Sequence, residues 1–289
     1  MTQTEPAGVS VPLAVRLLLG RAAVQVIATD VGADLLHIKG NAVDRSLRGR
    51  DAPGTDIDVM VRPTHIPRLH DALVQHGWVV YSSFVYGSPF GHAQTYRHPD
   101  WGYLDLHRMF PGIRLDPEAA FAELWRGRSE REFAGTPAAV PSVTAQALLL
   151  VLNDVRSRKA EQAMATWVDG PGLDRAEVAA LVGLLDARVA FSAATGDLAQ
   201  HRREPDYRLW KGITQGSTRA GEWWARARAA GTVREAAAIL VRAPLANVER
   251  LTHKLGRAPT RGELVRATAM RPVRALRELL VSVGRRFRR

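Results

Sequence analysis

The sequence feature that most constrains this chain is a pair of carboxylates inside an apolar, β-branched run. The run spans positions 55–62 and reads TDIDVMVR. Because side chains alternate along a strand, Asp56 and Asp58 are predicted to project to one side, and Ile57 and Val59 to the other. Aspartate is depleted in strands and two like charges repel, so the pair indicates a bound cation, with a solvated strand end as the alternative. Carboxylate oxygens suit Mg²⁺ or Mn²⁺.

A third carboxylate lies in similar surroundings further along the chain. Asp105 sits between Leu104 and Leu106, again in strand-like alternation. Three acids on two strands, preceded by a strand–Gly–helix turn, are typical of two-metal phosphoryl transfer. Two alternatives stay open: Asp105 could pair with an arginine, either Arg97 or Arg108, and His107 could orient Asp105 or simply fill the sheet.

The ordered set of motifs resembles a known family. Lys39-Gly40, then Asp56-x-Asp58, then Asp105-x-His107 on a later strand, is similar to the uncharacterised nucleotidyltransferase family of the DNA polymerase β superfamily. Members of that family resemble the small nucleotidyltransferases that modify antibiotics. The resemblance covers roughly positions 35–108. Where the wider superfamily has Gly-Ser before the acids, this chain has Lys39-Gly40-Asn41, so Lys39 or the Gly40 N–H would replace the serine hydroxyl.

The resemblance implies that an NMP group passes from an NTP to an acceptor hydroxyl with the help of Mg²⁺, or Mn²⁺ in its place. The residues expected to be both catalytic and metal-binding are Asp56, Asp58 and Asp105. A helix start after a glycine turn binds anions through free N–H groups, and an arginine fork suits phosphate oxygens. The residues expected to bind the nucleotide are Lys39, Gly40, Asn41, Arg48 and Arg50.

The sequence does not name the acceptor. ATP is the first expectation for the NTP, and a small molecule or a peptide or protein hydroxyl is favoured as acceptor over an RNA end. The alternative hypothesis is a binding module of the same fold that holds nucleotide or nucleic acid with weak or no turnover. Release of pyrophosphate from NTP and Mg²⁺ would separate the two hypotheses.

Several other chemistries are excluded or disfavoured. The 289 residues include no cysteine, which excludes disulfides, zinc–thiolate sites and cysteine nucleophiles. The chain shows no Gly-x-Ser-x-Gly elbow, phosphate-binding P-loop or His-Glu-x-x-His zinc motif. Its apolar runs, such as 145–152, are too short to span a bilayer, and positions 1–10 lack signal-peptide features. We therefore expect a cytoplasmic protein with no membrane partner.

Positive charge is concentrated at the C-terminal end. The first 200 residues carry 19 basic and 22 acidic side chains, whereas the last 89 carry 21 and 7, a net charge of +14. Such a region favours anionic partners, so nucleic acid is a candidate partner, although a general arginine bias explains the excess equally well. Trp210, Trp223 and Trp224 lie in this basic region and could stack on a base or pack in a core.

Periodicity predicts an α+β fold: a mixed β-sheet nucleotidyltransferase domain with flanking helices on one side of the sheet, followed by an all-helical domain. The boundary is expected at 135/136, where Gly135, Pro137 and Pro141 cluster, giving domains 1–135 and 136–289 with a basic C-terminal tail. Strands are expected at 34–39, 55–62, 78–85, 92–97, 102–108 and 129–133. Helices are expected at 11–29, 42–47 (capped by Asn41), 65–76 and 117–125. Further helices are expected at 144–158, 160–168, 175–185, 188–195, 207–211, 222–230, 233–242, 246–255, 261–270 and 273–283.

Overall fold

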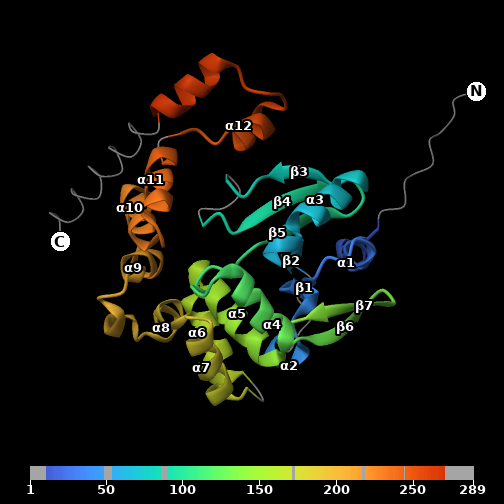
Figure 1. Ribbon diagram of the computed structural model, residues 1–289, viewed down its shortest axis with the longest axis vertical. Coiled ribbons are helices and arrows are strands. Elements are labelled where there is room, and N and C mark those ends of the chain that lie inside the picture. The colour runs from blue at the N-terminus through green and yellow to red at the C-terminus, as the bar shows by residue number, and fades with distance from the viewer. Residues whose placement is uncertain are drawn as a thin grey trace, which may run out of the picture.

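The computed structural model describes residues 11–48, 54–85, 90–170, 173–216, 219–243 and 245–270. Figure 1 shows a β-sheet region with helices around it and a helical arm whose far end returns to one edge of the sheet. The strands are β1 (Leu35–Ile38), β2 (Ile57–Val61), β3 (Val79–Ser82), β4 (Ala93–His98), β5 (Gly102–His107), β6 (Ser129–Phe133) and β7 (Thr136–Val140). This arrangement confirms the α+β class.

Helices precede, interrupt and follow the sheet. Those of the sheet region are α1 (Leu13–Asp30), η1 (Gly40–Ala42), α2 (Arg45–Arg48), η2 (Pro63–His65), α3 (Ile66–Gln75) and α4 (Pro117–Arg126). Those that follow are α5 (Val143–Arg156), α6 (Ala160–Asp169), α7 (Arg175–Leu184), α8 (Arg188–Thr195), η3 (Leu198–His201), α9 (Tyr207–Gln215), α10 (Arg219–Ala229), α11 (Val233–Arg242) and α12 (Val248–Leu255). Residues 261–270 are also helical, as expected. The predicted helix 273–283 lies outside the described residues.

The five-stranded sheet has the order β1-β2-β5-β4-β3. Only the β2–β5 pair is parallel among these described strands, and the other three pairs are antiparallel. The mixed sheet is therefore confirmed. The parallel pair places Asp58 directly opposite Asp105, so two acids that are 47 positions apart in sequence stand side by side.

Helices cover both faces of the sheet, which corrects the expectation of helices on one side. Ile57, Val59 and Leu104 belong to a core beneath α1 and α3, while Ile38 and Met60 belong to a second core with α4 and α5. The reason is that β2 is buried along its whole length, so its second face also carries apolar side chains. Helix α5 is buried on nearly all sides, as expected of a helix that is apolar all round.

The β6–β7 hairpin crosses the predicted boundary. The expected strand at 129–133 is present, but β7 follows it through a turn in which Ala134 and Gly135 have φ of 48° and 81°. Two consecutive residues of positive φ are typical of a tight hairpin turn. Phe133, Ala138 and Val140 pack on Ala42, so the first strand after the boundary is joined to the sheet region. The division into two domains remains a prediction.

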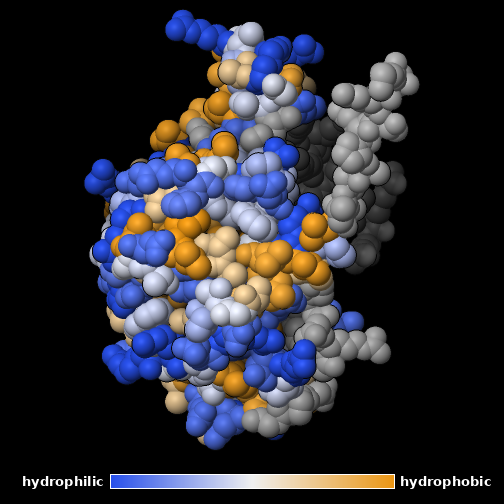
Figure 2. Space-filling view, turned by 90° about the vertical axis from the view of Figure 1, so that its right-hand side faces the viewer, coloured by the Kyte–Doolittle hydropathy of each residue, from blue (hydrophilic) through white to orange (hydrophobic). Residues whose placement is uncertain are grey.

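Helix α1 is apolar on its outer side as well as its inner side. Leu17, Val24 and Ile27 are buried against the sheet, whereas Leu19 and Val26 are exposed. Figure 2 shows this side of the molecule, where apolar residues form patches among the hydrophilic ones. None of the described helices is long and apolar enough to cross a membrane.

Gly20 allows α1 to lie close to the sheet, and this contact generates a stability prediction. A Cβ at Gly20 would lie 2.7 Å from Ile57 Cδ1 and 3.2 Å from Trp101 Cβ. We expect Gly20→Ala to lower the free energy of unfolding by about 1–3 kcal/mol, because overpacking outweighs the helical preference of alanine. Gly183→Ala in α7 is the matched control, since its Cβ would meet only Arg188 Nη2 at 3.8 Å. Denaturant unfolding measures both, and equal stability of the two variants would contradict the prediction.

Candidate active site

Asp58 and Asp105 lie on the same face of the sheet, on adjacent parallel strands. Ligand atoms of Asp58, Asp105 and His107 all lie within 4.8 Å of one another. The structure thus brings two of the three predicted acids together. Asp56 is not part of this group of three, because it precedes β2 and is only half-buried.

Asp58 is a buried carboxylate with two nitrogen partners. It is 6% exposed, and its Oδ1 lies 2.6 Å from Lys39 Nζ and 2.9 Å from His107 Nε2. Burial alone would raise the pKa of Asp58, but the Lys39 ammonium and the His107 ring outweigh burial and hold the pKa well below its usual range. Asp58 is therefore ionised at every ordinary pH.

His107 hydrogen-bonds to Asp58, whereas the sequence left open whether it orients Asp105 or fills the sheet. Burial, with Lys39 nearby, lowers the pKa of His107, so its ring is neutral at physiological pH. A neutral ring that bonds a carboxylate through Nε2 carries its proton there and donates it. His107 therefore fixes the orientation of Asp58 without adding charge.

Asp105 is oriented by a neighbouring strand. Its Oδ1 accepts a hydrogen bond from Thr95 Oγ1 at 2.6 Å, and the two residues are direct partners in the β4–β5 pair. The arginine that follows β5, Arg108, lies over the Phe84 ring at 4.9 Å instead of pairing with Asp105. Thr95 was not identified from the sequence. The available signal was its position, because pairing of the two neighbouring strands as a hairpin places Thr95 opposite Asp105.

The charges of the other two acids affect the pKa of Asp56. Burial raises the pKa of Asp56 to about 6, and the charges of Asp58 and Asp105 add to this effect, while Lys39 and Arg21 oppose it. Asp56 is thus the acid of the three whose negative charge is least compensated. This is the repulsion that the sequence pattern predicted for closely spaced carboxylates.

Lys39 reaches into the acids with a strained backbone. Its φ is 58°, in a region that non-glycine residues rarely adopt. Besides Asp58, its Nζ lies 3.4 Å from His107 Nε2 and 5.9 Å from the centre of the Phe110 ring. Lys39 therefore serves as the counter-ion of Asp58 in this structure, and its predicted contact with phosphate stays a prediction.

The segment after Lys39 differs from the expected helix 42–47. A 3₁₀ turn, η1, precedes the four-residue α2, and Asn41 makes no side-chain cap. Instead the Asn41 Oδ1 is buried without a partner. Gly40 has φ of 51° and lies next to Gly54, whose added Cβ would be 3.8 Å from Gly40 Cα. The segment that the sequence predicts to bind phosphate is therefore two short turns, and its α2 is only four residues long.

The two predicted arginines cannot be placed at the site. Arg48 is the last residue of α2, and its side chain is outside the described part of the structure. Arg50 lies outside the described residues altogether. Their roles toward phosphate remain predictions.

Two residues that sequence reasoning missed hold the loop in place. Arg21 of α1 is fully buried and donates to the backbone oxygens of Lys39 at 3.2 Å and Asp58 at 3.4 Å. Burial lowers its pKa to about 10, so it remains charged at physiological pH. Gln146 of α5 accepts from Asp44 N at 2.6 Å and donates to Pro141 O at 2.7 Å. Each is a polar residue in an apolar helical run, which was the available signal.

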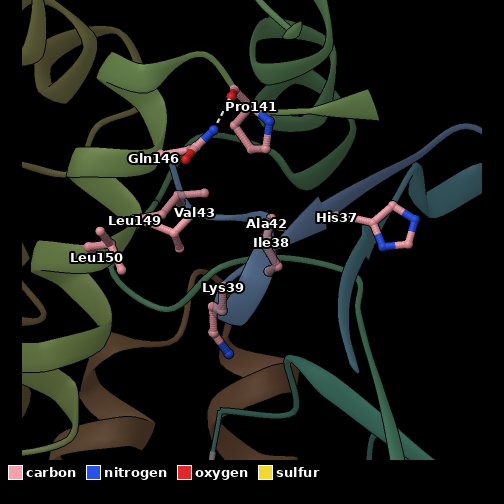
Figure 3. A pocket seen from close by; sticks show the side chains of 9 residues that line it. All are labelled: His37, Ile38, Lys39, Ala42, Val43, Pro141, Gln146, Leu149 and Leu150. Atoms are coloured by element: carbon pink, nitrogen blue, oxygen red, sulfur yellow. Dashed lines mark hydrogen bonds between the residues drawn. The ribbon is translucent and has the colours of Figure 1, made fainter. Parts of the chain in front are cut away.

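Figure 3 shows the cavity behind the loop. Its lining includes Val43, Gln146 and Leu149, and the Lys39 side chain extends away from these residues. The Gln146–Pro141 hydrogen bond appears as a dashed line across the top of this cavity. The apolar cavity is therefore structural, and the chemistry of the site lies on the side to which Lys39 points.

Comparisons with known proteins identify a distant structural similarity. No protein-family model matches the chain, and no curated protein matches it. Among solved structures, the lincomycin-bound lincosamide antibiotic adenylyltransferase LnuA is similar with a TM-score of 0.36 and 18% identity, covering 52% of this chain and 94% of that one. Similarity at that level assigns neither a family nor a reaction.

The raised pKa of Asp56 generates a pH prediction for the metal-free protein. Its folded pKa of about 6 exceeds the unfolded value of about 3.9, so the folded state binds more protons between these pH values. The free energy of unfolding should therefore fall as the pH rises from 4 to 6. In the presence of a chelator, we expect Asp56→Asn to be more stable than wild type by about 1 kcal/mol at pH 8, with the effect reduced by solvent screening, and equal to it near pH 4.

Denaturant unfolding at several pH values measures this difference. Asp30→Asn, which removes an exposed acid at the end of α1, is the control for loss of an acid outside the site. A difference between Asp56→Asn and wild type that does not change with pH would show that Asp56 has an ordinary pKa.

The Lys39 contact generates a second stability prediction. Lys39→Met would leave the buried Asp58 charge without its cation, which costs about 3–5 kcal/mol for a fully buried pair. In a chelating buffer we expect the free energy of unfolding to drop by about 2–4 kcal/mol, with partial recovery in Lys39→Arg. Lys254→Met, at an exposed position of α12, is the control. Wild-type stability of Lys39→Met would mean that Lys39 is not the counter-ion of Asp58.

Proposed function

We propose that this protein transfers an NMP group from an NTP to an acceptor hydroxyl. The observation that carries the proposal is the placement of Asp58 and Asp105 abreast on parallel strands, with Asp56 close enough to feel both charges. Two carboxylates side by side in an otherwise apolar sheet, with a third just before β2, are costly unless a cation and its anionic substrate use them. The sequence motifs that resemble nucleotidyltransferases support the same reaction.

The donor set fits Mg²⁺ or Mn²⁺. Asp58 and Asp105 offer hard oxygen ligands close together, Asp56 would add a third, and His107 is engaged with Asp58. When bound, two such ions would draw the phosphate oxygens to the carboxylates and stabilise charge at the reacting phosphate. The raised pKa of Asp56 marks where an added positive charge would relieve most repulsion.

The covalent changes of the proposed reaction take place between substrate atoms, and the protein positions them. The acceptor oxygen would bond to the α-phosphorus, the bond from that phosphorus to the pyrophosphate oxygen would break, and pyrophosphate would leave. Asp105, held by Thr95, would accept the proton of the acceptor hydroxyl at its carboxylate. His107 and Arg21 would keep Asp58 in place, and Lys39 with the Gly40 turn would face the phosphates.

The charges of the site support this proposal. Three carboxylates face three buried or half-buried cations, since Arg21, Lys39 and Arg156 all interact with Asp58. The site is therefore close to neutral before any ligand binds. Two divalent ions roughly balance the charge of a triphosphate, so the metal–nucleotide complex adds little net charge, whereas free NTP would add a large negative one. Metal and nucleotide are thus expected to bind together.

The co-substrate and the acceptor follow the sequence expectations. ATP is the NTP that we would test first, and a small molecule or a peptide or protein hydroxyl is the acceptor class that we favour. The helical part would form the far wall of the site, because the Phe90 ring stacks near the Trp210 ring of α9, at 6.4 Å between centres. Trp210 itself is buried in the core, so packing is its role.

The decisive variants are Asp58→Asn and Asp105→Asn, which keep side-chain shape and remove the charge. We expect each to lower Mg²⁺-dependent pyrophosphate release from NTP by at least about 100-fold, because positioned charge at the phosphate is lost. Asp100→Asn is the control, since that acid is 75% exposed in the β4–β5 turn. Mass spectrometry of candidate acceptors, incubated with each NTP and Mg²⁺, would identify the product.

The outcomes separate the two hypotheses. If wild type binds Mg²⁺–ATP but releases no pyrophosphate with any acceptor, the chain is a nucleotide-binding module. If both asparagine variants retain near-normal turnover, the carboxylates do not carry the reaction.

A further inference from the structure

A half-buried arginine of α5 interacts electrostatically with the acids, as Lys39 does. Arg156, at the end of α5, donates from Nη1 to His92 Nε2 at 2.9 Å and from Nη2 to Asn153 Oδ1 at 3.1 Å. Both partners are neutral, because burial lowers the pKa of His92 far below its usual range. Within the described part of the chain, no carboxylate lies within ion-pair distance of Arg156.

Arg156 is nevertheless within electrostatic reach of the site. Burial lowers its pKa, and the charges of Asp58 and Asp105 are the interactions that oppose this shift. His92, which holds the guanidinium, lies with its ring centre 5.2 Å from that of His107, and His107 bonds Asp58. The guanidinium is therefore connected to Asp58 through His92 and His107, whose rings are tilted by 48° to each other.

Side chains from other segments surround His92, the partner of Arg156. Phe90 lies 6.0 Å from the His92 ring, between centres, and Arg226 of α10 sits over Phe90 and Trp223 at 5.8 and 5.1 Å. Three distant segments thus form one wall beside the acids. Arg226 differs from Arg156 because its charge is partnered by Glu222 at 3.6 Å and the acids of the site do not influence its pKa.

Arg156 is half-buried and is compensated by Asp58 and Asp105 only through longer-range interaction, so an anion in direct contact with its guanidinium would add stabilisation. We propose that Arg156 binds a phosphate-type oxyanion beside the carboxylates during the proposed nucleotidyl transfer, on which this inference rests. The planar guanidinium fork suits phosphate oxygens, and His92 and Asn153 leave it oriented for that contact. The oxyanion belongs either to the NTP or to an anionic acceptor, and the experiment distinguishes these sources.

The experiment compares Arg156→Met, Arg156→Lys and Arg226→Met in the full chain by calorimetric titration with three probes: Mg²⁺ alone, Mg²⁺–ATP and inorganic phosphate. We expect Arg156→Met to bind Mg²⁺–ATP about 10- to 100-fold more weakly, the usual loss for a hydrogen bond to a charged group. Arg156→Lys should recover part of this affinity, because the charge remains and the fork is lost. Arg226→Met, a matched buried arginine on the same wall, should bind Mg²⁺–ATP like wild type.

The binding results distinguish the two sources of the oxyanion and can overturn the inference. Unchanged ATP binding with lost phosphate binding in Arg156→Met supports an anionic acceptor as the source. Unchanged binding of both, with tighter Mg²⁺ binding, overturns the inference, because Arg156 then only balances the acids. An equal loss of Mg²⁺–ATP affinity in Arg226→Met also overturns the inference, because the affinity would then depend on both arginines and not on a specific contact of Arg156. If wild type binds no Mg²⁺–ATP but Arg156→Met still loses phosphate binding, the proposed function fails and the anion site stands.

Should Arg156→Met fail to fold, the test rests on Arg156→Lys. Thermal unfolding checks each variant first. Lost affinity in a folded Arg156→Lys, together with wild-type Mg²⁺ affinity, supports the fork contact. Wild-type affinity for ATP and phosphate in that variant contradicts it.

Discussion

The compensation of the buried Asp58 charge is the interaction on which the site depends. A carboxylate that is 6% exposed is stable only if cations or hydrogen-bond donors compensate its charge. Lys39, which directly follows β1, and His107, the last residue of β5, provide this compensation. The strained φ of Lys39 is the conformational cost of this contact. The geometry of the Lys39–Gly40 turn is therefore tied to the acid that it faces.

The same charge organises the layers around the sheet. Arg21 comes from the helix on one face and bonds the backbone of both Lys39 and Asp58, while Gln146 comes from the helix on the other face and bonds Asp44. The loop after β1 is thus held from both sides of the sheet. Because Arg21 is fully buried and charged, it also adds positive potential behind the acids. The packing of the two helices and the electrostatics of the site therefore depend on the same side chains.

The sequence predicted what depends on local periodicity. The alternation around Asp58 and Asp105 indicated two strands and one shared face, and parallel pairing brought the acids together as expected. It could not predict partners that only folding brings close: Arg21 is 37 positions from Asp58, and Gln146 is 102 from Asp44. Strand β7 was missed because proline and alanine have weak strand preference, and its pairing with β6 decided its structure instead.

The positive charge of the C-terminal helices has a different character from the cations at the acids. Arg21, Lys39 and Arg156 are wholly or partly buried and interact with specific carboxylates, so they act over short distances. Trp224, in contrast, is 56% exposed on α10, and Arg228 of the same helix is also exposed. Exposed charge is screened by salt within about 10 Å, so this surface can attract a polyanion but contributes little at the acids. Binding of a polyanion there and chemistry at the acids are therefore physically separable properties of the chain.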